Sequence, residues 1–360
     1  MKLRPVVWAA AALCLAVFLG SKYFLSHSPR AYLKARGDRA ARDESRLDPM
    51  RKFMKEKIYR QVPPELGSIA VAILLGDQTD VPSAARRSFS RSGTAHLLAI
   101  SGGNIALVAL SLIMIFRLLS IPRRWTYGLV IGVLIFYCAL TGAASSILRG
   151  TIMVSIYMAG SLFKRESEIL TSLAWAAIFI LLYDPLQLFD LGFQLSFISV
   201  FMIAAAAVGL EGTDPEGKRS FGRKARIYLE DSATVSLAAW VGAAPLIAHV
   251  FGMVTPVTLF ANLVLVPYFG LLQIGGFMYL SFGSLNGRLE EVLDFSLYFL
   301  CRGALALSDW FVSWPWSHFY VRPPGTVDVA VFYAAALLWA FRAQVKERIL
   351  MMRGRRAAAR

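Results

Sequence analysis

The stretch that decides the fold is residues 95–116, which read AHLLAISGGNIALVALSLIMIF. Its length is close to the about 20 apolar residues that cross a bilayer. A Ser-Gly-Gly-Asn break at residues 101–104 interrupts it, and His96 stands near its start. Polar and helix-loosening residues cost free energy in lipid, where each freed backbone N–H or C=O needs a partner. We therefore expect this segment to line a cavity or pack on another helix instead of facing lipid alone.

Apolar runs of similar length recur along the whole chain. Hydrophobic residues make up 57% of the sequence and the mean hydropathy is +0.55, whereas soluble domains are about 45–50% apolar. We expect an all-α, polytopic helical membrane protein with about ten transmembrane helices, some of them broken or kinked. The spans are placed at residues 5–25, 95–117, 126–142, 145–163, 169–184, 191–210, 232–250, 257–282, 292–313 and 327–343.

Basic residues sort the connections between these spans into two sets. The chain carries a net charge of +15, and Lys and Arg gather near residues 117–124, 164–165, 218–226 and 342–360. The alternate connections are acidic, uncharged or aromatic. Because short basic loops stay in the cytoplasm, both termini are expected there. Residues 1–25 would then form an N-terminal membrane anchor and residues 344–360 a basic cytoplasmic tail.

Residues 26–94 do not follow this charge rule. They would be external, yet they hold fourteen Lys and Arg against eight Asp and Glu. Either Leu66–Leu75 forms a further span, although about ten apolar residues are too few to cross, or the region is external and carries a short amphipathic helix, since longer loops obey the rule weakly. We favour the external arrangement. Its basic residues could collect a polyanion or could simply be a solvated helix face. The candidate DNA contacts are Arg51, Lys52, Lys55, Arg86 and Arg87.

Several polar residues fall in the outer part of spans that are expected to run inward. Each lies within about 15 Å of the start of its span, at about 1.5 Å per residue. Ionisable groups inside a membrane point to function, but amides can also join helices through hydrogen bonds worth about 0.6 kcal/mol each, and Arg149 could snorkel to the interface. Both interpretations stay open. The candidates for an outer polar vestibule are His96, Ser101, Asn104, Arg149, Gln194 and Asn262.

A series of landmarks stands in order between residues 66 and 285. It comprises Gly76-Asp77, Gly93-Thr94-Ala95-His96 before the Ser101-Gly102 break, Arg149 within residues 146–153, Asp184-Pro185 with residues 192–196, and Pro245, Pro256, Asn262 and Pro267. Together these landmarks resemble the ComEC family of bacterial transformation. The resemblance implies that residues 95–343 form a channel in the bacterial inner membrane that passes single-stranded DNA inward.

The resemblance also implies partners and has limits. The partners would be membrane lipids, a DNA receptor outside, a cytoplasmic ATP-driven helicase or DNA-binding protein, and a second copy of the chain in a homo-oligomer. Gly103 and Asn104 stand where family members often have an apolar residue and a His. Residues 26–94 are too few for the family's OB-fold domain, and no His-x-His-x-Asp-His string of its metallo-β-lactamase-like domain occurs. We therefore expect either a channel core without its nuclease, which a separate protein could supply, or a divergent relative of the family.

No residue pattern in the sequence indicates catalysis, a cofactor or a metal site. The four histidines are far apart and the three cysteines lie in apolar runs, unlike metal-ligand clusters. The segment Gly212–Lys218 matches G-x-x-x-x-G-K, but Arg219 replaces the Mg²⁺-binding Ser or Thr. We expect no enzymatic activity and no motor in the chain itself. The alternative function is a transporter or a membrane-bound enzyme that acts on a small anion or a lipid.

Overall fold

The computed structural model describes residues 48–142, 145–162, 169–207, 221–283 and 287–336. In these residues the chain is helical apart from its connections and one antiparallel ladder of two short strands, β1 (Met253–Val254) and β2 (Phe319–Tyr320). The predicted all-α class is confirmed in this part of the chain. The expected anchor at residues 1–25, the Gly212–Lys218 segment and the tail at residues 344–360 lie outside the described residues.

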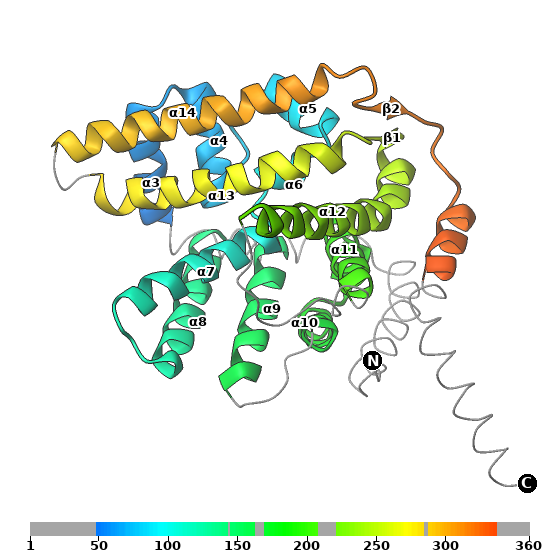
Figure 1. Ribbon diagram of the computed structural model, residues 1–360, viewed down its shortest axis with the longest axis horizontal. Helices are drawn as coiled ribbons and strands as arrows, with labels where there is room; N and C mark the ends of the chain where they lie inside the picture. Colours follow the sequence, from blue (N-terminus) through cyan, green and yellow to red (C-terminus); the bar gives the residue numbers. More distant parts are fainter. Residues whose placement is uncertain (1–47, 143–144, 163–168, 208–220, 284–286, 337–360) are drawn as a thin grey trace, which may run out of the picture.

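One layer of the molecule is built on two long antiparallel helices that run side by side in Figure 1, α13 (Thr258–Phe282) and α14 (Gly287–Val312). Three N-terminal helices pack against this pair: α3 (Asp48–Gln61), α4 (Pro64–Leu75) and α5 (Ser83–Arg91). The largest cluster of buried apolar side chains lies between these helices. This layer is therefore assembled from segments about 200 residues apart in the sequence.

The second layer is built from elements that are consecutive in the sequence. It contains α6 (Ala95–Leu98), α7 (Gly102–Leu118), α8 (Arg123–Leu140), α9 (Ser145–Leu162), α10 (Ile169–Tyr183), the 3₁₀ turn η1 (Pro185–Phe189) and α11 (Leu191–Ala207). The long helix α12 (Phe221–Phe251) packs against both α11 and α13 and lies between the two layers (Figure 1). Pro245 and Pro267 fall inside α12 and α13, whereas Pro256 lies in the turn between them.

The helix α4 is buried on every side. Pro64 at its first turn suits a helix start, and Gly76 ends it in the left-handed conformation at φ 73°. Every residue from Gly67 to Leu75 is buried, and the Leu74 side chain packs directly on the backbone of Gly276. The run Leu66–Leu75 is therefore a core helix, and the short amphipathic helix expected within residues 26–94 stays a prediction. In residues 48–94 it is α5 that has one buried face, with Phe89, and one exposed face, with Arg87.

Only part of the expected set of spans is confirmed. Among the described residues, four helices are long and apolar enough to cross a membrane: Arg123–Leu140, Glu230–Phe251, Thr258–Phe282 and Glu290–Val312. The other expected spans within the described residues are shorter apolar helices, including Gly102–Leu118 and Ile169–Tyr183. The chain is thus a helical protein with membrane-spanning segments, and the total of about ten remains a prediction.

Residues 48–94 contact α13 near both of its ends. The Lys57 ammonium lies 3.3 Å from the carbonyl oxygens of Tyr279 and Leu280 near the end of this helix. At its start, the Thr258 hydroxyl donates to the carbonyl of Ser92. With about 1.5 Å per residue, the two contacts lie about 30 Å apart along α13. Because α13 is long enough to span a bilayer, this packing of residues 48–94 does not favour an external position for all of them, and the external placement of residues 26–94 stays a prediction.

Candidate functional site

The expected break at residues 101–104 separates two helices in the structure. Helix α6 ends at Leu98 and α7 begins at Gly102, with the Ser101 hydroxyl as its N-cap, accepting from the Asn104 backbone N–H at 3.3 Å. An added Cβ at Gly150 of α9 would lie only 2.9 Å from the Gly102 Cα. The two glycines therefore allow α9 to touch the backbone at the break, where Ser146 also donates to the Ile100 carbonyl.

The Arg149 guanidinium is the most unusual polar group beside this break. Arg149 is 2% exposed, and its Nη2 donates to the Gly192 carbonyl at 2.9 Å. Its Cζ lies 5.9 Å from the ring centroid of Phe193. The Nε and Nη1 atoms are buried, and no acceptor for them exists among the described residues. Buried charged groups normally have their donors satisfied, so this guanidinium can still take an anionic oxygen.

Asn104 adds a second donor next to the same break. Its side chain is 5% exposed, and in the described part of the chain its Nδ2 has no acceptor. It sits in the first turn of α7, two residues from the Gly102–Gly150 contact. Arg149 precedes Gly150 directly, so Asn104 and Arg149 flank one helix–helix contact from α7 and α9. The structure thus brings three predicted residues to one place: Ser101, Asn104 and Arg149.

The other vestibule candidates are engaged differently. Gln194 donates from Nε2 to the Leu188 carbonyl at 2.9 Å and lies two residues from Gly192, so it belongs to the first turn of α11, which receives Arg149. Asn262 donates to the Ser236 hydroxyl at 3.4 Å and joins α13 to α12, a separate contact. The His96 side chain on α6 is exposed. A shared pore lining for all six residues stays a prediction.

Sequence reasoning missed the carbonyl of Gly192 and the neighbouring Asp190. An added Cβ at Gly192 would lie 3.0 Å from the Asp190 carboxylate and 3.6 Å from Arg149 Nη2. The Asp190 carboxylate also accepts from the Phe193 backbone N–H at 3.0 Å and so fixes the first turn of α11. An aspartate immediately before an apolar helix is the sequence signal that could have identified this cap.

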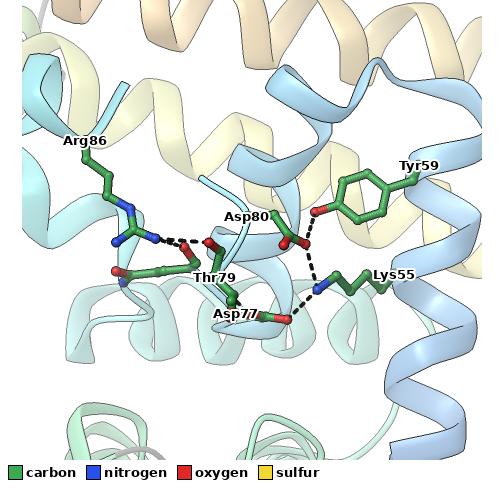
Figure 2. A network of polar contacts seen from close by, with 7 residues as sticks. Lys55, Tyr59, Asp77, Thr79, Asp80 and Arg86 are labelled. Atoms are coloured by element: carbon green, nitrogen blue, oxygen red, sulfur yellow. Dashed lines mark hydrogen bonds and ion pairs between the residues drawn. The ribbon is translucent and has the colours of Figure 1, made fainter. Parts of the chain in front are cut away.

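Two of the candidate DNA contacts take part in a polar network between α3 and the loop after α4 (Figure 2). The Lys55 ammonium lies 2.7 Å from the Asp77 carboxylate and 2.8 Å from that of Asp80. The Tyr59 hydroxyl donates to Asp80 at 2.9 Å. Arg86 donates to backbone carbonyls of the same loop, among them those of Thr79 and Val81, and closes it from the α5 side.

The charges of this network stabilise one another. Partial burial lowers the pKa of Lys55, but its hydrogen bonds with Asp77 and Asp80 outweigh that effect and raise it overall. Burial would raise the pKa of Asp77, yet the bonds from Lys55 and Thr79 bring it well below its usual range. The Lys55 and Tyr59 bonds lower the pKa of Asp80. At neutral pH the Lys55 ammonium and the carboxylates of Asp77 and Asp80 are therefore all charged, and their ion pairs hold α3 against the loop after α4. We call these contacts the Asp77 clamp.

These contacts show how part of the predicted DNA-binding set is engaged within the protein. Lys55 and Arg86 have donors directed to Asp77, Asp80 and the loop carbonyls, and a DNA contact at either of them stays a prediction. The Arg51 guanidinium lies beside Gly142 at the end of α8, where a cation suits the helix dipole. The side chains of Lys52 and Arg87 are exposed, and these two remain predicted contacts.

This chain is similar in sequence to known proteins over most of its length. The family model described as Competence protein matches residues 73–346. ComE operon protein 3 of Bacillus subtilis (strain 168) is 30% identical over 232 residues, which is 63% of this chain and 28% of that protein. Competence protein ComA of Neisseria gonorrhoeae is 25% identical over 225 residues, 58% of this chain and 32% of that protein.

An uncharacterized protein of Aquifex aeolicus (strain VF5) is 31% identical over 223 residues, 61% of this chain and 49% of that protein. The chain therefore matches less than half of the length of each of these relatives. No solved structure matches it. Because the family description covers the break, Arg149 and both long helices α13 and α14, the chain belongs to the competence protein family of the ComEC type.

Proposed function

We propose that this chain forms the membrane channel through which single-stranded DNA crosses the bacterial inner membrane during natural transformation. The family supports a role in transformation. The observation that carries the finer proposal is Arg149, a buried guanidinium with two nitrogen atoms that no described residue engages. A buried donor set of this kind suits an anionic ligand that arrives and leaves.

The chemistry of Arg149 fits a phosphodiester. A guanidinium donates in a planar fork that matches two phosphate oxygens, which an ammonium cannot do. Conduction also requires binding weak enough for release. One arginine and one amide, Asn104, beside the small residues Gly102 and Gly150 provide a sparse site of this kind. A denser basic wall would retain the polymer.

The break between α6 and α7 gives the strand a place to meet the protein. Broken helices in transporters place helix ends and unwound backbone at a ligand site within the membrane. Here the start of α7 carries two consecutive glycines, and the break is fixed by the contacts of Ser101 and Ser146. We infer that the strand passes this break with Arg149 on one side.

The proposal includes other components. We infer that a DNA receptor delivers the strand outside, that a cytoplasmic ATP-driven helicase or DNA-binding protein draws it in, and that a separate nuclease removes the complementary strand. A second copy of the chain would be needed if one copy does not enclose the path. In this scheme the chain itself performs no catalysis.

The second candidate is a transporter or membrane-bound enzyme for a small anion or lipid, which Arg149 would serve equally well. DNA binding by several phosphates predicts an affinity that falls steeply with salt, with a slope that grows with the number of phosphates neutralised. A small-anion site predicts no dependence on polymer length. The decisive test is uptake of fluorescently labelled DNA by cells with and without this gene. Loss of uptake in the deletion, restored by the gene, supports the channel; undiminished uptake contradicts it.

A further inference from the structure

A group of aromatic side chains covers the end of α14 and the segment that follows it. We call it the aromatic platform. Tyr320 is 71% exposed, Trp310 53% and Trp316 38%. The ring of Trp316 packs against those of Trp314 and Phe260, with centroids 5.0 and 5.5 Å apart. The platform consists of Phe260, Trp310, Trp314, Trp316 and Tyr320.

The platform is fixed in place. Strand β2 pairs with β1 after α12, at the end of α14 in Figure 1. The Val321 backbone N–H donates to the Gly252 carbonyl at 2.9 Å, and Gly252 adopts the φ of +60° that this close turn requires. His249 Nδ1 lies 2.7 Å from the Pro324 carbonyl. Exposed rings on an ordered backbone can bind flat partners without a large loss of conformational entropy.

Positive charge borders the platform. Arg322 is exposed two residues after Tyr320. Burial lowers the pKa of the His318 imidazole, and the positive charge of Arg91 at the end of α5 lowers it further. The nearby carboxylates are already engaged, because Asp309 accepts from Ser88 and Asp328 from the Gly325 N–H. The surface therefore combines exposed rings with arginines at its edge.

The platform also adjoins the approach to the broken helix. Arg91 ends α5, and the next three residues lead directly into α6. That connection is fastened to the start of α13 by Thr258, whose hydroxyl would collide with any side chain at Gly93. Phe260 of the platform lies two residues beyond Thr258. The platform is thus connected, through the first turn of α13, to the segment that leads into α6.

We propose that the aromatic platform stacks the bases of single-stranded DNA before the strand reaches the broken helix. Grooves for single strands combine cations for the phosphates with aromatic rings for the bases, as this surface does. This inference rests on the proposed function and adds a binding surface to it. A lipid-interface anchor is the competing role for exposed Trp and Tyr. Phe319 and Tyr320 are consecutive in a strand and both exposed, so their side chains leave opposite faces. Such a segment stands clear on two sides, which fits stacking better than one-sided immersion in lipid.

The test uses the full chain in lipid nanodiscs and two labelled oligonucleotides of about twenty units, oligo(dT) and an abasic strand with the same number of phosphates. Wild type should bind oligo(dT) more tightly. Tyr320→Leu and Trp316→Leu keep an apolar side chain but lose the ring, so each should weaken oligo(dT) binding at least about fivefold and leave abasic binding unchanged. Tyr320→Phe should retain wild-type binding. The control is Trp125→Leu, which removes an exposed ring beside Arg124 on a different helix.

Each other outcome overturns the inference in a distinguishable way. If both Leu variants bind the two oligonucleotides as wild type does, the platform does not stack bases, although DNA binding by the chain stands. If the variants reduce incorporation into nanodiscs and leave the ratio of the two affinities unchanged, the rings are a lipid anchor. If wild type binds neither strand, the platform and the proposed DNA channel both fall.

Discussion

Lys57 and Tyr279, 222 residues apart, each hydrogen-bond the backbone of the other. The Tyr279 hydroxyl donates to the Lys57 carbonyl at 2.9 Å, and the Lys57 ammonium lies 3.3 Å from the Tyr279 carbonyl and 5.1 Å from the centre of its ring. A cation at the end of α13 is also favourable toward the helix dipole. This reciprocal contact fastens α3 to one end of α13 and so determines where the N-terminal helices lie.

Removing the hydroxyl tests how much this contact stabilises the fold. Tyr279 is fully buried, so Tyr279→Phe removes the side-chain hydrogen bond to the Lys57 carbonyl and should lower the free energy of unfolding by about 1 kcal/mol. The measurement is thermal unfolding in detergent. Tyr298→Phe is the control, because that hydroxyl contacts only the exposed Arg302 among the described residues. Equal losses in the two variants would contradict a special role for the Lys57 contact.

The two ends of residues 48–94 should be accessible from opposite sides of the membrane. Arg60 lies one turn after Lys57 and has a 75% exposed side chain, whereas Arg87 is exposed on α5, near the other end of α13. In intact cells, a membrane-impermeant maleimide should label a cysteine at only one of these positions, and permeabilisation should expose the other. The variants are Arg60→Cys and Arg87→Cys, with unmodified protein as the background. Labelling of both cysteines in intact cells would instead support an external position for all of residues 48–94.

The helix break and its neighbours could be predicted because they depend on local sequence. Ser101 is a good N-cap, Gly102 and Gly103 loosen the helix, and the break lies where these residues stand. The same local reasoning identified Arg149 and Asn104 as polar groups in apolar segments. Their burial and unengaged donors confirm that they are unusual, although not that they line a path.

The position of α4 could not be predicted in the same way. Its apolar run is too short to cross a bilayer, and length was the argument for placing it outside. A short helix can nevertheless be surrounded by longer ones, and here Leu74 contacts Gly276, 202 positions later. Lys55 was likewise assigned to DNA from its charge alone, because nothing local shows that Asp77 and Asp80 lie opposite it. Long-range packing decided both cases.

The Asp77 clamp predicts a specific response to acid. The folded protein lowers the pKa of Asp77, so this carboxylate contributes stability above its unfolded pKa of about 3.9. The contribution is lost as pH falls through the lower folded value. Between pH 6 and pH 3 the melting temperature of wild type should therefore fall more than that of Asp77→Asn, which should already be less stable at pH 6. Glu56→Gln, at an exposed side chain 4.0 Å from Arg60, is the control and should follow wild type. If the melting temperatures of all three proteins fell by the same amount between pH 6 and pH 3, the contacts of Asp77 would not stabilise the fold.

Substitutions at Arg149 provide the most direct test of the channel proposal. Arg149→Lys keeps the charge but loses the planar fork, and Arg149→Gln loses both. If the guanidinium contacts phosphate, DNA uptake should fall in both variants, at least about tenfold in Arg149→Gln, because a hydrogen bond to a charged group contributes about 1.5–3 kcal/mol. Uptake is normalised to protein abundance, measured by immunoblot, because both variants also lose the Arg149 hydrogen bond to the Gly192 carbonyl. Free substitution by Lys would indicate that Arg149 only reaches toward the interface.

Asn104→Ala separates a role in the path from a role in packing. The Asn104 amide oxygen accepts from the Ser101 hydroxyl at 3.3 Å, whereas no described residue accepts from its buried Nδ2. Its removal therefore deletes one long hydrogen bond within the first turn of α7 and should lower abundance little. If the amide contacts the strand, uptake should fall by about two- to tenfold, in line with a neutral hydrogen bond of about 0.5–1.5 kcal/mol. Asn262→Ala is the matched control, because that amide donates to Ser236 between α12 and α13 and its loss should lower abundance instead. Normal uptake in Asn104→Ala and in both Arg149 variants, at equal abundance, would exclude the break between α6 and α7 as the DNA path.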